Sequence, residues 1–189
     1  FIETMAKEEV ENPLNDGDCF KIVSVARLSY AKGIDNAVRA LKILVDKGYD
    51  NIKWYVVGYG GDEILIRNLI KENELEDKFI LLGKKINPYP YMKSADLYVQ
   101  PSRYEGKAVT VCEAQILSKP VLITNYTTAK SQIKDGFDGC ITELSVEGIA
   151  NGIEKLYKDK DLREKLSNNC KNTNYSNKDE LQKLYELFV

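Results

Sequence analysis

Short apolar segments of strand length alternate with segments of helical periodicity along most of this chain. The first apolar segment is Phe20–Ala26, and apolar residues then recur at helical spacing from Ile34 to Val45, before Gly48. Strands that alternate with amphipathic helices form a parallel sheet with helices on both faces. The sequence therefore predicts an α/β fold built on a doubly wound parallel sheet. Five further strands are expected at Trp54–Val57, Phe79–Leu82, Asp96–Gln100, Pro120–Thr124 and Gly139–Thr142.

The same periodicity predicts the remaining helices. Asp62 is expected to cap a helix, and Val109–Leu117 is expected to form another. Helical spacing also marks three stretches of the last third of the chain, which are residues 149–157, 162–166 and 181–188.

The composition is that of one folded domain. The chain has 189 residues, of which 43% are apolar and 30% charged, and its formal net charge is −2. A protein that binds nucleic acid needs a large basic face, so this slightly negative net charge argues against a nucleic-acid partner. Residues 1–18 are acidic, contain Pro13 and Gly17 and lack periodicity, so we interpret them as a linker. Residues 19–189 form the predicted domain.

Histidine is absent, so a histidine base, metal ligand or triad member within this chain is excluded. The four cysteines do not form a CxxC pair. We therefore expect no metal site, but reduced cysteines, some of them buried, as in a cytoplasmic protein. These cysteines are Cys19, Cys112, Cys140 and Cys170.

Polar residues suited to binding or catalysis follow the predicted strands. A doubly wound sheet binds its ligands at this edge, beyond the carboxyl ends of its strands. Arg27 and Lys32 follow the first strand, and Gly33 then opens a helix. Two cations beside a helix N-terminus can hold a phosphate or diphosphate. Solvated surface cations are the alternative. The turn Gly58-Tyr59-Gly60-Gly61 after the second strand is not a dinucleotide fingerprint, and it fits a tight turn or a close approach to a ligand.

The segment after the fourth strand holds the most polar residues. Glu105 is expected in a loop and Glu113 near the start of the next helix, with seven residues between them. The free backbone N–H groups at that helix start, residues 108–110, would face an anion. Because a carboxylate can accept two hydrogen bonds from a vicinal diol, the two glutamates suit a ribose and a sugar. Two ordinary surface glutamates are the alternative.

Five segments together resemble the C-terminal domain of the retaining glycosyltransferases with the GT-B fold, of the group 1 or family 4 type found in lipopolysaccharide and capsule biosynthesis. The resemblance runs from about Phe20 to Val189. Its most specific element is the spacing of Glu105 and Glu113. It implies a Rossmann-like domain that is one half of a GT-B fold. The segments are ARLSYAKG, VVGYGG, LLGKK, ADLYVQPSRYEGKAVTVCEA and SKPVLITN.

The resemblance also implies a role for each candidate residue. Arg27 and Lys32 would neutralise the donor diphosphate. Glu105 would lie beside the transferred sugar, and Glu113 would bind the ribose hydroxyls. The loop after the third strand would hold the base through Lys84, Lys85 and Ile86. The remaining implied donor contacts are Gly58, Gly106, Lys107, Ala108, Val109 and Thr110, among which Lys107 and Ala108 depart from the Phe-Gly that is common in the family.

The implied activity is transfer of a sugar from a nucleotide-diphosphate sugar to a glycan or lipid-linked acceptor. No metal and no cofactor are expected, because cations and helix dipoles can stabilise the leaving diphosphate. The resemblance also implies an N-terminal domain, missing from this chain and joined to it by residues 1–18. That domain would hold the acceptor, so this chain alone is expected to be inactive. The expected location is the cytoplasm, with peripheral contact to the inner face of the membrane left open. The alternatives are a nucleotide-sugar-binding module without activity and a GT-B nucleotide-sugar epimerase.

Overall fold

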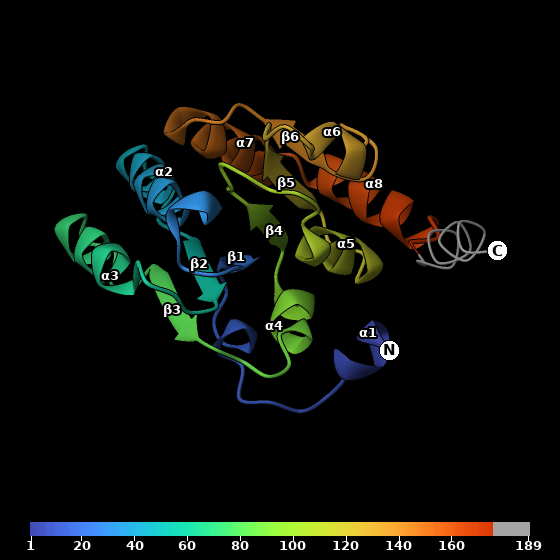
Figure 1. Cartoon of the computed structure of the whole chain (residues 1–189), viewed down its shortest axis with the longest axis horizontal. Coiled ribbons are helices and arrows are strands. Elements are labelled where there is room, and N and C mark those ends of the chain that lie inside the picture. Colours follow the sequence, from blue (N-terminus) through green and yellow to red (C-terminus); the bar gives the residue numbers. More distant parts are fainter. Residues whose placement is uncertain (176–189) are drawn as a thin grey trace.

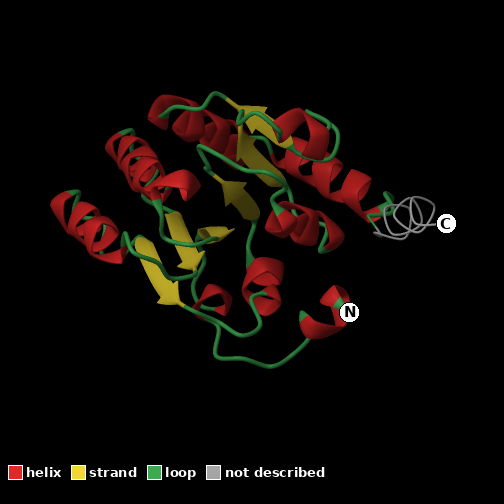
Figure 2. Cartoon of the chain, in the orientation of Figure 1, coloured by secondary structure: helices red, strands yellow, loops and turns green. Residues whose placement is uncertain are grey.

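The structure, a computed structural model, describes residues 1–175. Its centre is a parallel sheet in the order β3-β2-β1-β4-β5-β6, which confirms the predicted doubly wound α/β fold (Figures 1 and 2). Every strand that the sequence predicts is present within two residues of its expected bounds. The strands are β1 (Phe20–Val25), β2 (Ile52–Val57), β3 (Phe79–Gly83), β4 (Leu97–Gln100), β5 (Val121–Thr124) and β6 (Cys140–Thr142).

Helices cover both faces of this sheet. One face carries α2 (Ile34–Asp46), α3 (Glu63–Glu72) and α7 (Val146–Lys158), whose buried residues share one core cluster. The other face carries α4 (Tyr89–Ser94), α5 (Val109–Ile116) and α6 (Ala129–Gln132) around a second cluster. Helix α8 (Lys160–Lys171) packs against α5 and α7. The helix that the sequence predicts over 181–188 lies outside the described residues.

Alternating strand residues separate the two clusters. On β2, Trp54 and Val56 face the α2 side, whereas Tyr55 and Val57 face the α5 side. All four are almost fully buried, as expected for a sheet that is covered on both faces. The Trp54 indole donates a 3.0 Å hydrogen bond to Oγ of Ser24 on β1, so its polar atom is satisfied inside the core.

The sequence did not predict α4 and α6. Both are short: six and four residues. Helix α4 begins after Pro88 and contains Pro90 in its first turn, where a missing N–H group costs nothing. Segments this short lack enough turns for periodicity to be visible.

Residues 1–18 pack against the domain. This segment contains α1 (Ile2–Met5) and a 3-10 turn, η1 (Pro13–Asn15). Asn12 Nδ2 donates to the Pro90 carbonyl (3.2 Å) and to Ser94 Oγ (3.1 Å), and the Leu14 side chain is buried. The domain boundary at residue 18 stays a prediction, but the segment before it is docked onto α4.

Strand order places the expected site. The chain winds from β1 outward to β2 and β3, and then crosses to β4 on the other side of β1. Ligands of such sheets bind at this switch point, beyond the carboxyl ends of the two adjacent strands. The loops after β1 and β4, residues 26–33 and 101–108, therefore flank the switch point. Within residues 1–175, no helix is long and apolar enough to cross a membrane.

Candidate functional site

The loops after β1 and β4 lie in direct contact at the switch point. Gly33 has a φ of 66° and caps α2, which a short 3-10 turn, η2 (Tyr30–Lys32), precedes. A Cβ atom on Gly33 would lie 2.0 Å from the Pro101 carbonyl oxygen. The backbone N–H of Arg103 donates to the Ala31 carbonyl at 2.8 Å. Only glycine at position 33 allows the two loops to approach each other this closely.

The Arg103 side chain ties the two loops together, a contact that the sequence analysis missed. Its guanidinium donates two 2.8 Å hydrogen bonds to the Asp35 carboxylate and one of 2.8 Å to the Tyr30 carbonyl. It also lies 4.1 Å from the centre of the Tyr30 ring. Burial alone would raise the pKa of Asp35, but the hydrogen bonds and charge of Arg103, with help from Arg39, lower it. The pair is thus a mostly buried, ionised clamp.

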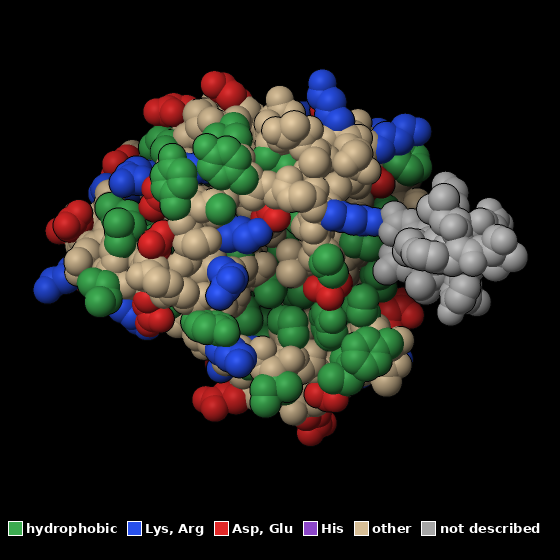
Figure 3. Space-filling view, viewed as in Figure 1, with side chains coloured by type: hydrophobic (Ala, Val, Ile, Leu, Met, Phe, Trp, Pro, Cys, Tyr) green, Lys and Arg blue, Asp and Glu red, His purple; other side chains and the backbone are tan. Residues whose placement is uncertain are grey.

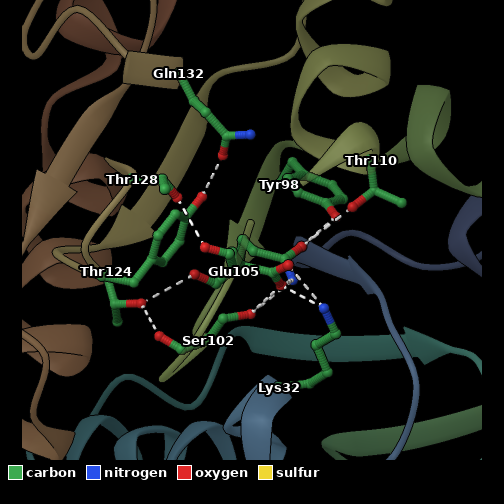
Figure 4. A network of polar contacts seen from close by, with 10 residues as sticks. Lys32, Tyr98, Ser102, Glu105, Thr110, Thr124, Thr128 and Gln132 are labelled. Carbon is green, nitrogen blue, oxygen red and sulfur yellow. Dashed lines mark hydrogen bonds and ion pairs between the residues drawn. The ribbon is translucent and has the colours of Figure 1, made fainter. Parts of the chain in front are cut away.

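Lys32 and Glu105 form an ion pair between the loops after β1 and β4 (Figure 4). Lys32 Nζ lies 2.7 Å from Oε1 and 2.8 Å from Oε2 of Glu105. The Glu105 side chain is 6% exposed, whereas that of Lys32 is 26% exposed. The structure thus brings together two predicted site residues that are 73 positions apart in sequence.

Two further side chains that the sequence analysis missed hold Glu105. Gln100 Nε2 donates to Oε1 at 3.0 Å, and Ser102 Oγ donates to the same oxygen at 2.6 Å. Gln100 and Ser102 are almost fully buried. One feature of the sequence could have indicated Gln100: it ends an otherwise apolar strand of a sheet that is covered on both faces. A glutamine amide that is buried in this way needs polar partners.

The backbone of the Glu105 loop is also fixed (Figure 4). Thr124 Oγ1 donates to the Ser102 carbonyl at 2.5 Å, and Thr128 Oγ1 donates to the Glu105 carbonyl at 2.9 Å. Thr124 ends β5, and Thr128 precedes α6. The loop that carries Glu105 is therefore held from three strands' ends, those of β1, β4 and β5.

Glu113 lies on α5, as predicted, and is half-buried. Tyr89 donates a 2.9 Å hydrogen bond to its Oε1. Burial, and then this hydrogen bond, raise the pKa of Tyr89 to about 12, so the phenol stays a donor at neutral pH. Oε2 of Glu113 has no hydrogen-bond partner among residues 1–175, and it is available to a ligand.

An anion site is expected at the N-terminus of α5. Ala108 is its N-cap, and its side chain is buried in the core. The backbone N–H groups of Ala108, Val109 and Thr110 have no partner in the described part of the chain. Gly106 has neither a positive φ nor any atom within 4 Å of the place where a Cβ would lie. The chain's own packing therefore does not require glycine there.

The other predicted residues lie at neighbouring strand ends. Arg27 is exposed after β1, and its side chain forms no ion pair or hydrogen bond with any described residue. Gly58, after β2, approaches Ala26 so closely that a Cβ would lie 1.8 Å from the Ala26 carbonyl oxygen, so this glycine serves backbone packing whether or not a ligand binds.

The predicted base loop follows β3, two strands from β1. Lys84 lies over the Tyr59 ring and Lys85 over the Tyr91 ring, while Ile86 is fully exposed. Among the described residues, this loop forms no hydrogen bond or ion pair with Lys32 or Glu105. In Figure 3, Lys and Arg side chains lie near the middle of the face seen in Figure 1, among apolar side chains.

Cys140 and Cys170 are buried, as expected of some of the cysteines, and none of the four cysteines forms a disulfide. Burial raises the pKa of Cys140 and raises that of Cys170 to about 11. These two thiols are therefore inert packing groups at neutral pH.

Comparison with known proteins gives the family. The model of the glycosyl transferases group 1 matches residues 5–173. A capsular polysaccharide biosynthesis glycosyltransferase of Staphylococcus aureus, CapM, is 31% identical over 97% of this chain and 50% of its own length. An N-acetylgalactosaminyltransferase of Campylobacter jejuni, named for a diphospho-undecaprenol substrate, is 31% identical over 79% of this chain and 40% of its own length.

Solved structures agree on the fold. A crystal structure of a TarM variant of S. aureus, in a complex that includes UDP, has a TM-score of 0.81 at 24% identity and covers 89% of this chain and 35% of that one. The chain thus spans half or less of the length of each of these three proteins. By its sequence match over residues 5–173, this chain belongs to the family of the glycosyl transferases group 1.

Proposed function

We propose that this chain is the donor-binding half of a retaining glycosyltransferase, which moves a sugar from a nucleotide-diphosphate sugar to a glycan or lipid-linked acceptor. The observation that carries the proposal is the junction of Lys32 and Glu105 at the switch point of the sheet. A cation for phosphate and a carboxylate for hydroxyls meet where such folds bind nucleotides. The UDP in the TarM complex and the diphospho-undecaprenol in the name of the Campylobacter relative support the donor and acceptor classes.

The residues act on the donor as follows. Arg27 and Lys32 bind the diphosphate and stabilise the negative charge that gathers on it as the sugar leaves. The free N–H groups of α5, at residues 108–110, add their dipoles to this stabilisation. Glu105 contacts the transferred sugar, and Glu113 accepts hydrogen bonds from the ribose. These charges supply what a divalent metal would otherwise supply.

The reaction proceeds through an oxocarbenium-like transition state, with the anomeric configuration kept. Lys84, Lys85 and Ile86 hold the base, and Gly58, Gly106 and Lys107 complete the donor contacts. The acceptor is held by a second domain, so the 189-residue chain binds donor but transfers no sugar. The protein works in the cytoplasm, where its lipid-linked acceptors lie at the inner face of the membrane.

The proposal predicts metal-independent binding of a nucleoside diphosphate. Calorimetry with UDP, GDP and ADP should show binding to at least one of them, equally in magnesium and in EDTA. Lys32→Ala or Arg27→Ala should each weaken it about ten- to a hundredfold, because a charge-assisted phosphate contact is lost. Lys71→Ala, which removes an exposed lysine on α3, is the control and should change nothing. Binding that appears only with magnesium would contradict the proposal.

Gly106→Ala should separate binding from stability. Because a Cβ meets open space at this position, the variant should unfold at the same or higher denaturant concentration, with a gain of at most about 1 kcal/mol. Its affinity for the nucleoside diphosphate should fall, because the methyl group occupies the ligand's side of the loop. Chemical denaturation and calorimetry measure the two effects, and unchanged affinity would remove Gly106 from the site.

Two other functions give different results with the full-length protein. A binding module would bind nucleotide-sugar without turnover, and an epimerase would change the sugar's stereochemistry without any acceptor. A glycosyltransferase consumes donor only with acceptor or by slow hydrolysis. NMR of the product distinguishes retention from inversion, and an inverted anomeric centre would contradict the retaining mechanism.

A further inference from the structure

We propose that Gln100 and Ser102 are positioning residues that let Lys32 exchange Glu105 for the donor diphosphate. The inference rests on the proposed function and deepens it. It makes the Lys32–Glu105 ion pair a latch that diphosphate opens, after which Glu105 is ready to accept a hydroxyl of the donor sugar.

The two oxygens of Glu105 have unequal surroundings. Oε1 accepts hydrogen bonds from Gln100 Nε2 (3.0 Å), Ser102 Oγ (2.6 Å) and Lys32 Nζ (2.7 Å). Oε2 accepts only from Lys32 among the described residues, at 2.8 Å. When Lys32 leaves, Oε1 keeps two donors and Oε2 has none. The oxygen left open is the one that can take a new hydroxyl.

Lys32 cannot serve both anions equally. An ammonium has three N–H donors, and here two short contacts engage the carboxylate. The Glu105 side chain is only 6% exposed, so it has little contact with water while Lys32 is in place. A buried carboxylate without its counter-ion is costly unless other donors hold it. Gln100 and Ser102 are those donors, and both approach from the strand side.

The orientation of the Gln100 amide is fixed by its own partners (Figure 4). Its Oε1 accepts from Tyr98 Oη at 2.7 Å and from Thr110 Oγ1 at 3.3 Å. Tyr98 is fully buried, which raises its pKa and keeps its phenol a donor. The amide nitrogen must therefore face Glu105. The arrangement gives Glu105 a permanent donor that does not depend on Lys32.

The latch makes an unusual prediction about a bare nucleoside diphosphate, which has no sugar to offer Oε2. Glu105→Gln removes the anion that competes for Lys32, so it should bind a bare nucleoside diphosphate about threefold or more tightly. Ser102→Ala removes a donor that stabilises Glu105 after Lys32 has left, so it should bind about threefold or more weakly. Loss of a merely structural contact would weaken binding in both variants.

The closing experiment is a double-mutant cycle, measured by calorimetry with UDP, GDP or ADP, whichever binds the wild type, and with inorganic diphosphate. The Ser102→Ala/Glu105→Gln variant should match Glu105→Gln alone, because Ser102 acts through the carboxylate charge. Gln100→Met removes the other donor to Glu105 that does not depend on Lys32, so it should weaken binding as Ser102→Ala does. Ser24→Ala also removes a buried, hydrogen-bonded hydroxyl, but one whose partners are the Val99 carbonyl and the Trp54 indole rather than Glu105, and it should leave affinity unchanged.

The outcomes separate the two proposals. If the wild type binds no nucleoside diphosphate, the proposed function fails and the latch fails with it. If the wild type binds and Lys32→Ala weakens binding, but Glu105→Gln weakens or does not change it, the site stands and the latch is overturned. Additive effects in the double variant would also overturn it. Thermal unfolding of each variant confirms that affinity is compared between folded proteins.

Discussion

Gly33→Ala is expected to destabilise the chain by about 3 kcal/mol or more and to abolish diphosphate binding, because it adds left-handed backbone strain to overpacking. Gly33 has a φ of 66°, and its new Cβ would lie 2.0 Å from the Pro101 carbonyl oxygen. That oxygen belongs to backbone and cannot rotate away. The loops after β1 and β4 must separate, and Lys32 moves away from Glu105. Urea denaturation measures the stability, and calorimetry measures the binding.

Gly136→Ala is the matched control. Gly136 has a similar φ of 73°, but nothing lies within 4 Å of the place where its Cβ would be. The Gly136→Ala variant should lose about 1 kcal/mol of its free energy of unfolding, the cost of the left-handed backbone alone. The difference between the two variants isolates the contact between the loops. Equal losses would show that the approach of Gly33 to Pro101 is not needed for the fold.

Most of the fold follows from local pattern. Apolar runs such as Phe20–Val25 are long enough to predict a strand, and the helical spacing from Ile34 to Val45 predicts the helix that follows it. The right-handed winding of such units then brings Lys32 and Glu105 to the same edge. That rule accounts for their position at one end of the sheet. It did not predict the ion pair, which depends on side-chain reach across a gap that only the folded backbone defines.

The supporting residues could not be predicted for a related reason. In the sequence, Arg103 looks like one more surface cation, and Ser102 like a turn residue after Pro101. The importance of Arg103 comes from its contact with Asp35, 68 positions away in the sequence. That of Ser102 comes from its contact with Glu105, in a loop whose conformation Thr124 and Thr128 fix from another segment. Asn12 likewise looked like part of a linker, although its amide fixes the segment to α4. Long-range polar contacts leave no periodic trace in a sequence, unlike apolar faces.

The Arg103–Asp35 clamp predicts the second large effect. Arg103→Met should destabilise the chain by about 2 kcal/mol at pH 7, less than for a fully buried pair, because the two side chains are 13% and 16% exposed. It should also weaken nucleoside diphosphate binding, because the Tyr30–Lys32 turn loses its tie to the β4 loop. Arg103→Lys keeps the charge but not the two-pronged contact, so it should recover only part of both losses.

The clamp also sets a pH dependence with a definite sign. Because Arg103 holds the pKa of Asp35 below its ordinary value of 3.8, the pair stabilises the fold fully above that value and loses its effect as the pH falls through the lowered pKa. Urea denaturation from pH 7 to pH 2 should therefore show wild type and Arg103→Met converging only in strong acid. Arg67→Met, which breaks an exposed helical pair with Glu63, should cost less than about 1 kcal/mol throughout. A loss for Arg103→Met as small as this control's would mean that Arg103 is ordinary surface and that the two loops are held by their backbone contacts alone.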